Sequence, residues 1–203
     1  MIAYLRDPAE IYRRSFAMIR AEADLTGLPS SLQDVAVRMI HACGMIDIVA
    51  DLRWSPDFAE RARAALTAGA RVITDSRMVA DGVAAADLRR RIACVLDAPR
   101  TADAGTTRTA AGLERFARDL DGAVVVIGNA PTALFRLLEL VDEGTARPAA
   151  IIGLPVGFVG AAESKAELAT NARGMAFLTL LGRRGGSAMA AAAVNALAME
   201  APA

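Results

Sequence analysis

The chain has 203 residues, of which 54% are hydrophobic, and its 23 basic side chains balance 23 acidic ones. This length and composition are typical of one compact folded domain and exclude disorder for most of the chain. The zero net charge, the lack of a long basic run and the 4% aromatic content leave no evident nucleic-acid-binding surface.

Capping and helix-breaking residues predict that the first third of the chain (1–69) is mainly helical, with helices over about 7–25, 30–46 and 55–68. Asp7, Pro8 and Glu10 form a typical helix start, with a cap residue, a proline at the first helical position and an acid three residues after the cap. Ser30 begins the second helix by the same logic, and Ser55 precedes the third.

From Gly69 onward, short β-rich runs alternate with turns and alanine-rich helical stretches. The runs lie at 71–74, 92–96, 123–127, 149–152 and 177–181. Continuous apolar runs are typical of strands buried on both faces of a parallel sheet. We therefore predict an α/β fold, a mostly parallel, doubly wound, flavodoxin-like sheet with helices on both faces, preceded by the helical region. No linker divides the chain, so 1–203 is expected to be one domain, with a mobile loop over 98–109.

No membrane span or disulfide framework is expected. The longest apolar stretches, 148–162 and 188–199, are interrupted by polar or turn residues and fall short of the ~20 apolar residues that span a bilayer. Residues 1–10 are charged and lack the pattern of a signal peptide, so we expect a cytoplasmic protein. Cys43 and Cys94 lie far apart and are expected to be reduced, buried thiols.

Three glycine-rich segments follow predicted strands, at 128–132, 153–160 and 182–187. Ligands of open parallel sheets bind beyond the carboxyl ends of the strands, and free N–H groups at helix N-termini favour anions. In the first segment, Asn129 and the backbone N–H groups before a helix at Pro131 are expected to face a ligand. In the third, Ser187 is expected to cap a helix. The alternative, that these are ordinary tight turns, stays open at this point.

The common nucleotide and metal motifs are absent. No two glycines are separated by a single residue, the only lysine (Lys165) is not preceded by glycine, and a single histidine cannot form a two-histidine metal motif. That histidine, His41, lies in an apolar helical run. The residues alone allow two interpretations, a hydrogen-bonded core residue or a general acid.

Five segments resemble the precorrin-8X methylmutase family: 11–16, 38–44, 128–134, 155–165 and 184–188. They occur in the family's order and spacing over nearly the whole chain. Cobalt-precorrin-8 methylmutases share these motifs. The sequence departs from the family pattern at 98–108, which is shorter, and at 76–77, where Ser-Arg replaces a smaller or acidic pair.

The resemblance implies an isomerase of cobalamin biosynthesis that moves a methyl group from C11 to C12 of precorrin-8X and gives hydrogenobyrinic acid. It implies no redox step, no external cofactor and no metal. It also implies a homodimer with the active site near the subunit interface, and it allows transient contacts with neighbouring enzymes of the pathway. An intramolecular migration needs a held conformation and a placed proton, which is consistent with the absent nucleotide and metal motifs.

By the resemblance, His41 is the catalytic acid that protonates ring C of the tetrapyrrole. The other site residues that it implies, for contacts with the substrate's carboxylates and macrocycle, are Arg14, Ser15, Arg108, Asn129, Thr132, Val156, Gly157, Phe158, Val159, Glu163, Ser164, Lys165, Gly185, Gly186 and Ser187. For each arginine, a solvated surface charge is the alternative.

Three other functions stay open from the sequence. The chain could act on cobalt-precorrin-8 of the anaerobic route and give cobyrinic acid. It could bind a tetrapyrrole without converting it, in which case replacing His41 would leave its function unchanged. It could also be a flavodoxin-like anion-binding domain with no affinity for tetrapyrroles.

Overall fold

The N-terminal region is mainly helical, as expected, but the boundaries of its elements differ from the prediction. The computed structural model describes residues 2, 4–97 and 105–199. The first elements are α1 (Pro8–Glu22), α2 (Ser30–Cys43), the 3-10 helix η1 (Ile46–Asp51), β1 (Leu52–Trp54) and α3 (Phe58–Thr67).

Helix α1 begins as predicted, because the Asp7 carboxylate accepts a hydrogen bond from the Ala9 N–H at 3.0 Å. The predicted cap of α2 was wrong. Ser30 is already the first helical residue, and no side chain caps this helix. At its other end α2 stops at Gly44, which has φ 71°, a left-handed conformation that favours glycine. Ile46 therefore opens η1 instead of continuing α2.

Strand β1 is a correction, since the first third of the chain was expected to be helical. It pairs antiparallel with β6 (Ala176–Leu180), with Leu52 opposite Leu180 and Trp54 opposite Leu178. Three residues are too few to show a periodic pattern, and the partner strand lies far along the chain. The strand therefore depends on a long-range contact that local sequence does not reveal.

The second part of the chain alternates strands and helices as predicted. It contains β2 (Val72–Thr74), α4 (Arg77–Gly82), α5 (Ala86–Arg89), β3 (Ile92–Cys94), η2 (Val95–Asp97), α6 (Arg108–Arg115), η3 (Ala117–Asp119), β4 (Val124–Ile127), α7 (Pro131–Asp142), β5 (Ala150–Gly153), α8 (Ala161–Thr170), β6 and α9 (Ser187–Ala198). Of the loop predicted at 98–109, residues 98–104 lie outside the described residues, and 108–109 belong to α6.

The sheet has the order β1-β6-β5-β4-β2-β3, and all pairs except β1 with β6 are parallel. Counted along the chain, the five parallel strands have the order 2-1-3-4-5, which is the flavodoxin-like order. The predicted mostly parallel, doubly wound α/β fold is confirmed. The order reverses between β2 and β4, where such folds bind their ligands.

Both faces of the sheet are buried. In β4, Val124 and Val126 pack into one hydrophobic core with α3 and α9, whereas Val125 and Ile127 pack into a second core with α6, α7 and α8. Burial of both faces explains why the strand sequences are continuous apolar runs.

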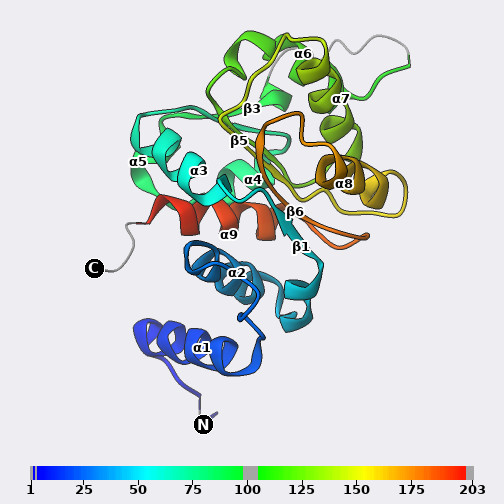
Figure 1. Cartoon of the computed structure of the whole chain (residues 1–203). Coiled ribbons are helices and arrows are strands. Elements are labelled where there is room, and N and C mark those ends of the chain that lie inside the picture. Colours follow the sequence, from blue (N-terminus) through cyan, green and yellow to red (C-terminus); the bar gives the residue numbers. More distant parts are fainter. Residues whose placement is uncertain (1, 3, 98–104, 200–203) are drawn as a thin grey trace.

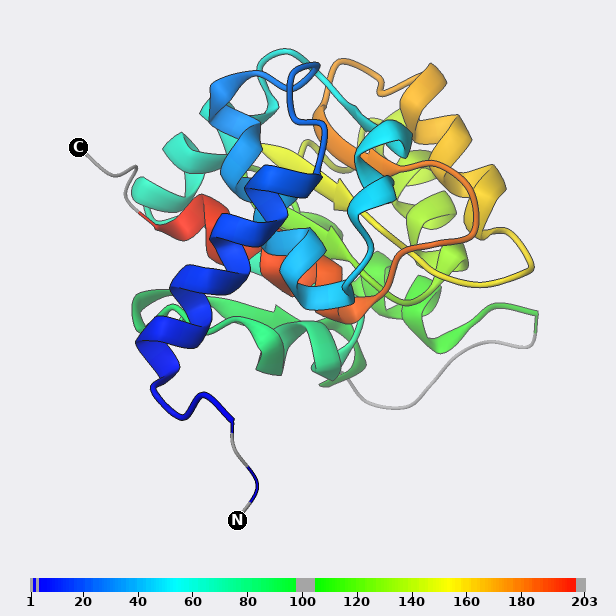
Figure 2. The ribbon, with the colours of Figure 1, turned by 90° about the horizontal axis from the view of Figure 1, so that it is seen from below.

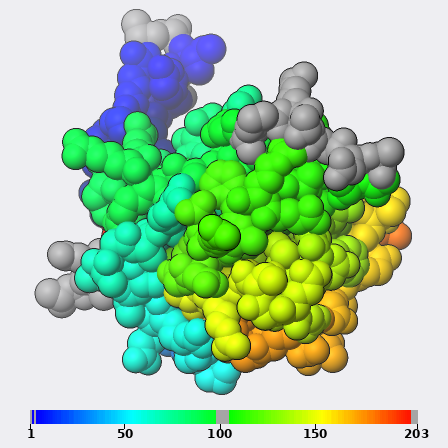
Figure 3. Space-filling view, turned by 90° about the horizontal axis from the view of Figure 1, so that it is seen from above, coloured from blue at the N-terminus to red at the C-terminus, as the bar shows by residue number. Residues whose placement is uncertain are grey.

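Helices α2 and α1 add further layers on the α9 side. Helix α2 packs on α9 and α1 packs on α2, so α1 is the outermost helix (Figures 1 and 2). In the space-filling view the N-terminal segment, in blue, projects beyond the rest of the molecule (Figure 3). Ile11, Tyr12 and Met18 of α1 expose large apolar side chains to solvent.

Both cysteines are free thiols. Cys94 is buried as predicted, whereas Cys43 is half-buried. Burial raises the pKa of each thiol, which favours the protonated form. Among the residues that the structure describes, no helix is long and apolar enough to cross a membrane.

Candidate active site

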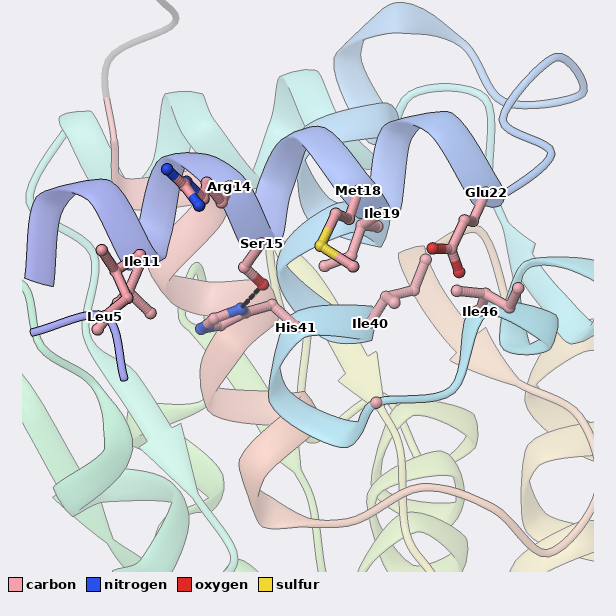
Figure 4. Close-up of a pocket in the computed structure, with 11 residues that line it drawn as sticks. Leu5, Ile11, Arg14, Ser15, Met18, Ile19, Glu22, Ile40, His41 and Ile46 are labelled. Atoms are coloured by element: carbon pink, nitrogen blue, oxygen red, sulfur yellow. Dashed lines mark hydrogen bonds between the residues drawn. The ribbon is translucent and has the colours of Figure 1, made fainter. Parts of the chain in front are cut away.

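An open pocket of about 460 Å³ lies between α1, α2 and the start of η1 (Figure 4). Its apolar wall includes Ile11, Met18, Ile19, Ile40 and Ile46. Its polar lining includes Arg14, Ser15, Glu22 and His41. The pocket therefore combines a large apolar surface with a few polar groups, which is typical of ligand sites.

His41 lies in the last turn of α2, and Ser15 faces it from the middle of α1. The Ser15 hydroxyl oxygen is 2.8 Å from Nδ1 of His41. Figure 4 shows the imidazole with this nitrogen toward Ser15 and its other nitrogen pointing away from Ser15. A protonated imidazole would donate Nδ1–H to the serine oxygen and leave Nε2–H for a ligand. His41 is exposed, so the core-residue interpretation does not apply.

Two aromatic rings pack edge-on against the imidazole, and a cation lies over both rings. The ring centroids of Tyr12 and Phe16 each lie 5.3 Å from that of His41, in edge-on arrangements. The guanidinium of Arg38 lies 5.4 Å from the Tyr12 ring centroid and 5.6 Å from that of Phe16. These contacts restrict the orientation of the imidazole.

Arg14 lies at the edge of the pocket, with 67% of its side chain exposed. Its Nε is paired with Glu10, one turn earlier in α1. Within the described ranges Glu10 is its ion-pair partner, and the remaining N–H donors of its guanidinium can meet a ligand carboxylate, since Arg has five of them.

The remaining predicted site residues lie on other elements, around the carboxyl ends of the parallel strands. Arg108 is the first residue of α6, and Asn129 and Thr132 flank the start of α7; all three are exposed. The Thr132 hydroxyl is 2.8 Å from that of Thr107. These polar groups are therefore accessible in this chain.

The backbone N–H groups at 128–130 are not free for a ligand, contrary to the prediction. The carboxylate of Asp75, at the end of β2, accepts hydrogen bonds from the N–H groups of Gly128, Asn129 and Ala130 at 2.9, 2.9 and 2.7 Å. Asp75 is fully buried, and this burial raises its pKa, while the three N–H donors oppose the rise. The protein thus places its own carboxylate where flavodoxin-like folds bind an anion.

The loop between β5 and α8 presents an exposed apolar surface. Phe158 and Val159 are 83% and 89% exposed, and Val156 is 43% exposed. The guanidinium of Arg183, from the loop after β6, lies 5.2 Å from the Phe158 ring centroid. Gly157 donates its N–H to the Arg183 carbonyl at 3.2 Å.

At the start of α8, Glu163 is exposed, whereas Ser164 and Lys165 are fully buried. The Lys165 ammonium donates to the backbone carbonyl of Arg184, and Ser164 donates to the Ala161 carbonyl at 3.3 Å. Burial, with a contribution from the Arg184 charge, lowers the pKa of Lys165 to about 8. In this conformation both side chains are satisfied inside the protein.

The turn before α9 is built by close packing. A Cβ added to Gly185 would lie 2.4 Å from the Leu154 carbonyl oxygen, so only glycine fits there. Gly186 donates its N–H to the same carbonyl at 2.8 Å. The predicted cap by Ser187 was wrong: Ser187 is buried, its side chain caps no helix end, and its hydroxyl lies 3.2 Å from that of Ser76.

The structure therefore divides the predicted residues into two groups. Arg14, Ser15 and His41 share the α1–α2 pocket, and none of the other predicted site residues is among the residues that line it. Sequence reasoning missed Asp75 and the residues around His41, namely Tyr12, Phe16 and Arg38. Their helical spacing, with Tyr12 and Phe16 four residues apart, was the available signal. No group of three or more metal-ligating side chains occurs among the described residues.

A protein-family model matches nearly the whole chain. The family model described as "CbiC: Precorrin-8X methylmutase" matches residues 10–200. The matched region contains Arg14, Ser15 and His41 of the pocket and the loops at the carboxyl edge.

Individual relatives carry related names. A precorrin-8X methylmutase from Pseudomonas aeruginosa is 58% identical, with 98% of this chain and 99% of the relative covered, and one from a Sinorhizobium species is 54% identical, with 96% of each covered. A cobalt-precorrin-8 methylmutase from Priestia megaterium is 34% identical, with 95% of this chain and 88% of the relative covered. A solved structure of precorrin-8X methylmutase from Thermus thermophilus matches with a TM-score of 0.85 at 36% identity, covering 94% of each chain.

Proposed function

This chain belongs to the precorrin-8X methylmutase family and is an isomerase of cobalamin biosynthesis, and we propose that its substrate is the cobalt-free precorrin-8X. Two relatives named for that substrate are 58% and 54% identical to it, whereas the cobalt-precorrin-8 methylmutase from Priestia megaterium is 34% identical. The reaction moves a methyl group from C11 to C12 of the macrocycle and gives hydrogenobyrinic acid. Atoms and electrons balance within the substrate, because the C11–methyl bond breaks as the C12–methyl bond forms.

The observation that carries the mechanism is the Ser15–His41 pair in the apolar pocket. We assign His41 as the acid that protonates ring C, which favours a 1,5-sigmatropic shift of the methyl group. Ser15 holds Nδ1 at 2.8 Å and leaves Nε2 as the donor toward the substrate. A general acid placed in this way accelerates a proton transfer by ~10²–10⁴-fold.

The substrate's acetate and propionate carboxylates need cationic and polar partners. We assign Arg14 and Arg108 to these carboxylates, because both arginines are exposed and Arg binds carboxylates through paired N–H donors. Asn129 and Thr132 supply further polar contacts. The exposed surface of Val156, Phe158 and Val159 is assigned to the flat face of the macrocycle.

We further propose that the enzyme acts as a homodimer whose active sites each use residues of both chains. The pocket holds about 460 Å³ and is open, while a tetrapyrrole with its acid side chains exceeds the drug-sized ligands that fill pockets of ~300–1,000 Å³. The carboxyl-edge residues of a second copy would complete the enclosure. The exposed apolar residues of α1 supply surface for such an interface.

We assign the enzyme to the cytoplasm, where free thiols such as Cys43 and Cys94 stay reduced. We also propose transient contacts with neighbouring enzymes of the pathway, through which the macrocycle passes from one enzyme to the next.

The absorption spectrum of the protein with precorrin-8X tests the reaction, since methyl migration changes the conjugated system. The wild type is expected to convert the substrate, and His41→Ala is expected to bind it without conversion. Conversion by His41→Ala at the wild-type rate would contradict the role of His41. If neither protein converts precorrin-8X, the same assay with cobalt-precorrin-8 separates the cobalt branch from a carrier.

A further inference from the structure

Arg184, in the loop between β6 and α9, clamps two carboxylates of η1. Its Nη1 donates to Asp47 at 2.6 Å, and its Nη2 donates to Asp51 at 2.7 Å. The planar guanidinium directs its N–H groups in fixed directions, so one side chain holds both acids at once. A lysine ammonium is a point charge on a flexible stem, so it would not hold both acids in fixed directions.

The backbone of Arg184 is held from the other side. Its carbonyl accepts the buried Lys165 ammonium, and the adjacent Gly185 leaves no room for a side chain against the Leu154 carbonyl. The next residue, Gly186, donates to that same carbonyl. The loop that carries Arg184 is therefore fixed to the loop after β5, which presents the exposed apolar surface.

The clamped helix η1 forms part of the His41 pocket. Ile46, its first residue, lines the pocket, and Gly44, also part of the lining, ends α2 three residues after His41. The other end of η1 is tied to the same loop, because the Leu181 N–H donates to the Asp51 carbonyl at 2.9 Å.

We propose that Arg184 is a positioning residue for the isomerisation, an inference that rests on the proposed function. It holds the η1 wall of the His41 pocket at a set place relative to the loops at the carboxyl edge of the sheet. Its charge is engaged by Asp47 and Asp51, so it is not a receptor for a substrate carboxylate. Its neighbour Arg183 differs, because within the described part of the chain it contacts the Phe158 ring and has no ion-pair partner.

The test uses the fact that His41 is the only histidine in the sequence. In an untagged, ¹⁵N-labelled protein without ligand, the imidazole signals report on this one side chain. The variants are Arg184→Met, Arg184→Lys and Asp47→Ala, and the matched control is Arg183→Met at the adjacent position. Thermal unfolding shows which variants fold, and kcat and KM for precorrin-8X are measured on each.

Arg184→Met is expected to shift the imidazole signals and to lower kcat about 10-fold while KM changes less than about twofold, since small misplacements of catalytic groups are costly. Arg184→Lys is expected to recover part of kcat, and Arg183→Met is expected to leave the imidazole signals of the ligand-free protein unchanged. Unchanged imidazole signals, or an unchanged kcat, in a folded Arg184→Met protein overturn the proposal.

If Arg184→Met does not fold, the imidazole signals and kcat of Asp47→Ala test the proposal instead. This variant is expected to fold, because the Asp47 side chain is 70% exposed. A wild-type protein that does not convert precorrin-8X contradicts the proposed function, and the imidazole signals of the variants then decide alone whether Arg184 positions His41. The two failures are therefore distinguishable.

Discussion

The Asp75 carboxylate ties the end of β2 to the start of α7, where the strand order reverses. Asp75→Asn removes the negative charge and one of the two acceptor oxygens that serve three N–H donors. We expect this variant to lose about 2–4 kcal/mol of unfolding free energy, because buried donors are left without partners. The measurement is chemical denaturation at pH 7.

The matched control is Asp97→Asn. Asp97 forms an exposed ion pair with Arg77 on the surface, and such pairs contribute about 0–1 kcal/mol. Equal stability losses in the two variants would show that the Asp75 hydrogen bonds contribute little.

The lowered pKa of buried Lys165 predicts that the stability of the protein depends on pH. Its pKa of about 8 in the folded protein lies below the ordinary value of 10.5, because burial disfavours the charged amine. Between these two values the unfolded chain binds more protons than the folded one, so the contribution of Lys165 to stability rises from pH 8 to 10.5. The gain is on the order of 3 kcal/mol.

Denaturant unfolding of the wild type and Lys165→Met, across that pH range, measures this contribution. The difference between the two proteins is expected to move in favour of the wild type as the pH rises. No other ε-amine complicates the comparison, since Lys165 is the only lysine in the sequence. A difference that is independent of pH would refute a lowered pKa.

At the scale of elements, the end of α2 determines where His41 lies. Gly44 has φ 71°, which costs a residue with a side chain ~1–2 kcal/mol. Gly44→Ala is expected to lower stability by about that amount and to reduce kcat, because the same turn leads into the pocket wall. The control is Gly27→Ala, at a glycine with no positive φ and no neighbour within 4 Å of an added Cβ. Equal effects of the two substitutions would contradict this role of the turn.

At the scale of the whole molecule, shared active sites predict complementation between two inactive variants. His41→Ala removes the acid, and Phe158→Asp places a charge on the surface assigned to the macrocycle. If one site uses His41 of one chain and Phe158 of the other, a mixed dimer retains one intact site. An equal mixture is then expected to recover roughly a quarter of wild-type activity, because half of the symmetric dimers are mixed.

The measurement is the conversion rate after the two variants are co-expressed, with each variant alone as the control. If both residues belong to the same chain's site, each subunit of the mixed dimer carries one of the two substitutions, so both sites are impaired and no activity is recovered. Placing both substitutions on one chain and co-expressing it with wild type gives the reciprocal test, because sites within one chain then leave the wild-type subunit active. Shared sites then leave both sites of the mixed dimer impaired.

Local patterns determined much of this protein from sequence alone. Asp7 and Pro8 begin α1 where the capping residues indicate, and each β-rich run after Gly69 became a strand of the parallel sheet. Continuous apolar runs require burial on both faces, which led directly to the doubly wound fold. The segments around His41 and at 155–165 indicated the protein family, because each is a contiguous and specific motif.

Long-range contacts decided the rest. Strand β1 needs a partner strand more than a hundred residues away in the sequence. The N–H groups at 128–130 were predicted to face a ligand, but in the folded chain they donate to the Asp75 carboxylate. The sequence predicted Lys165 to contact the substrate, but its side chain is buried and its ammonium donates a hydrogen bond to the Arg184 carbonyl. A sequence shows which groups are present, whereas only the folded chain shows which partner each group meets, because hydrogen bonding and burial depend on distances in space.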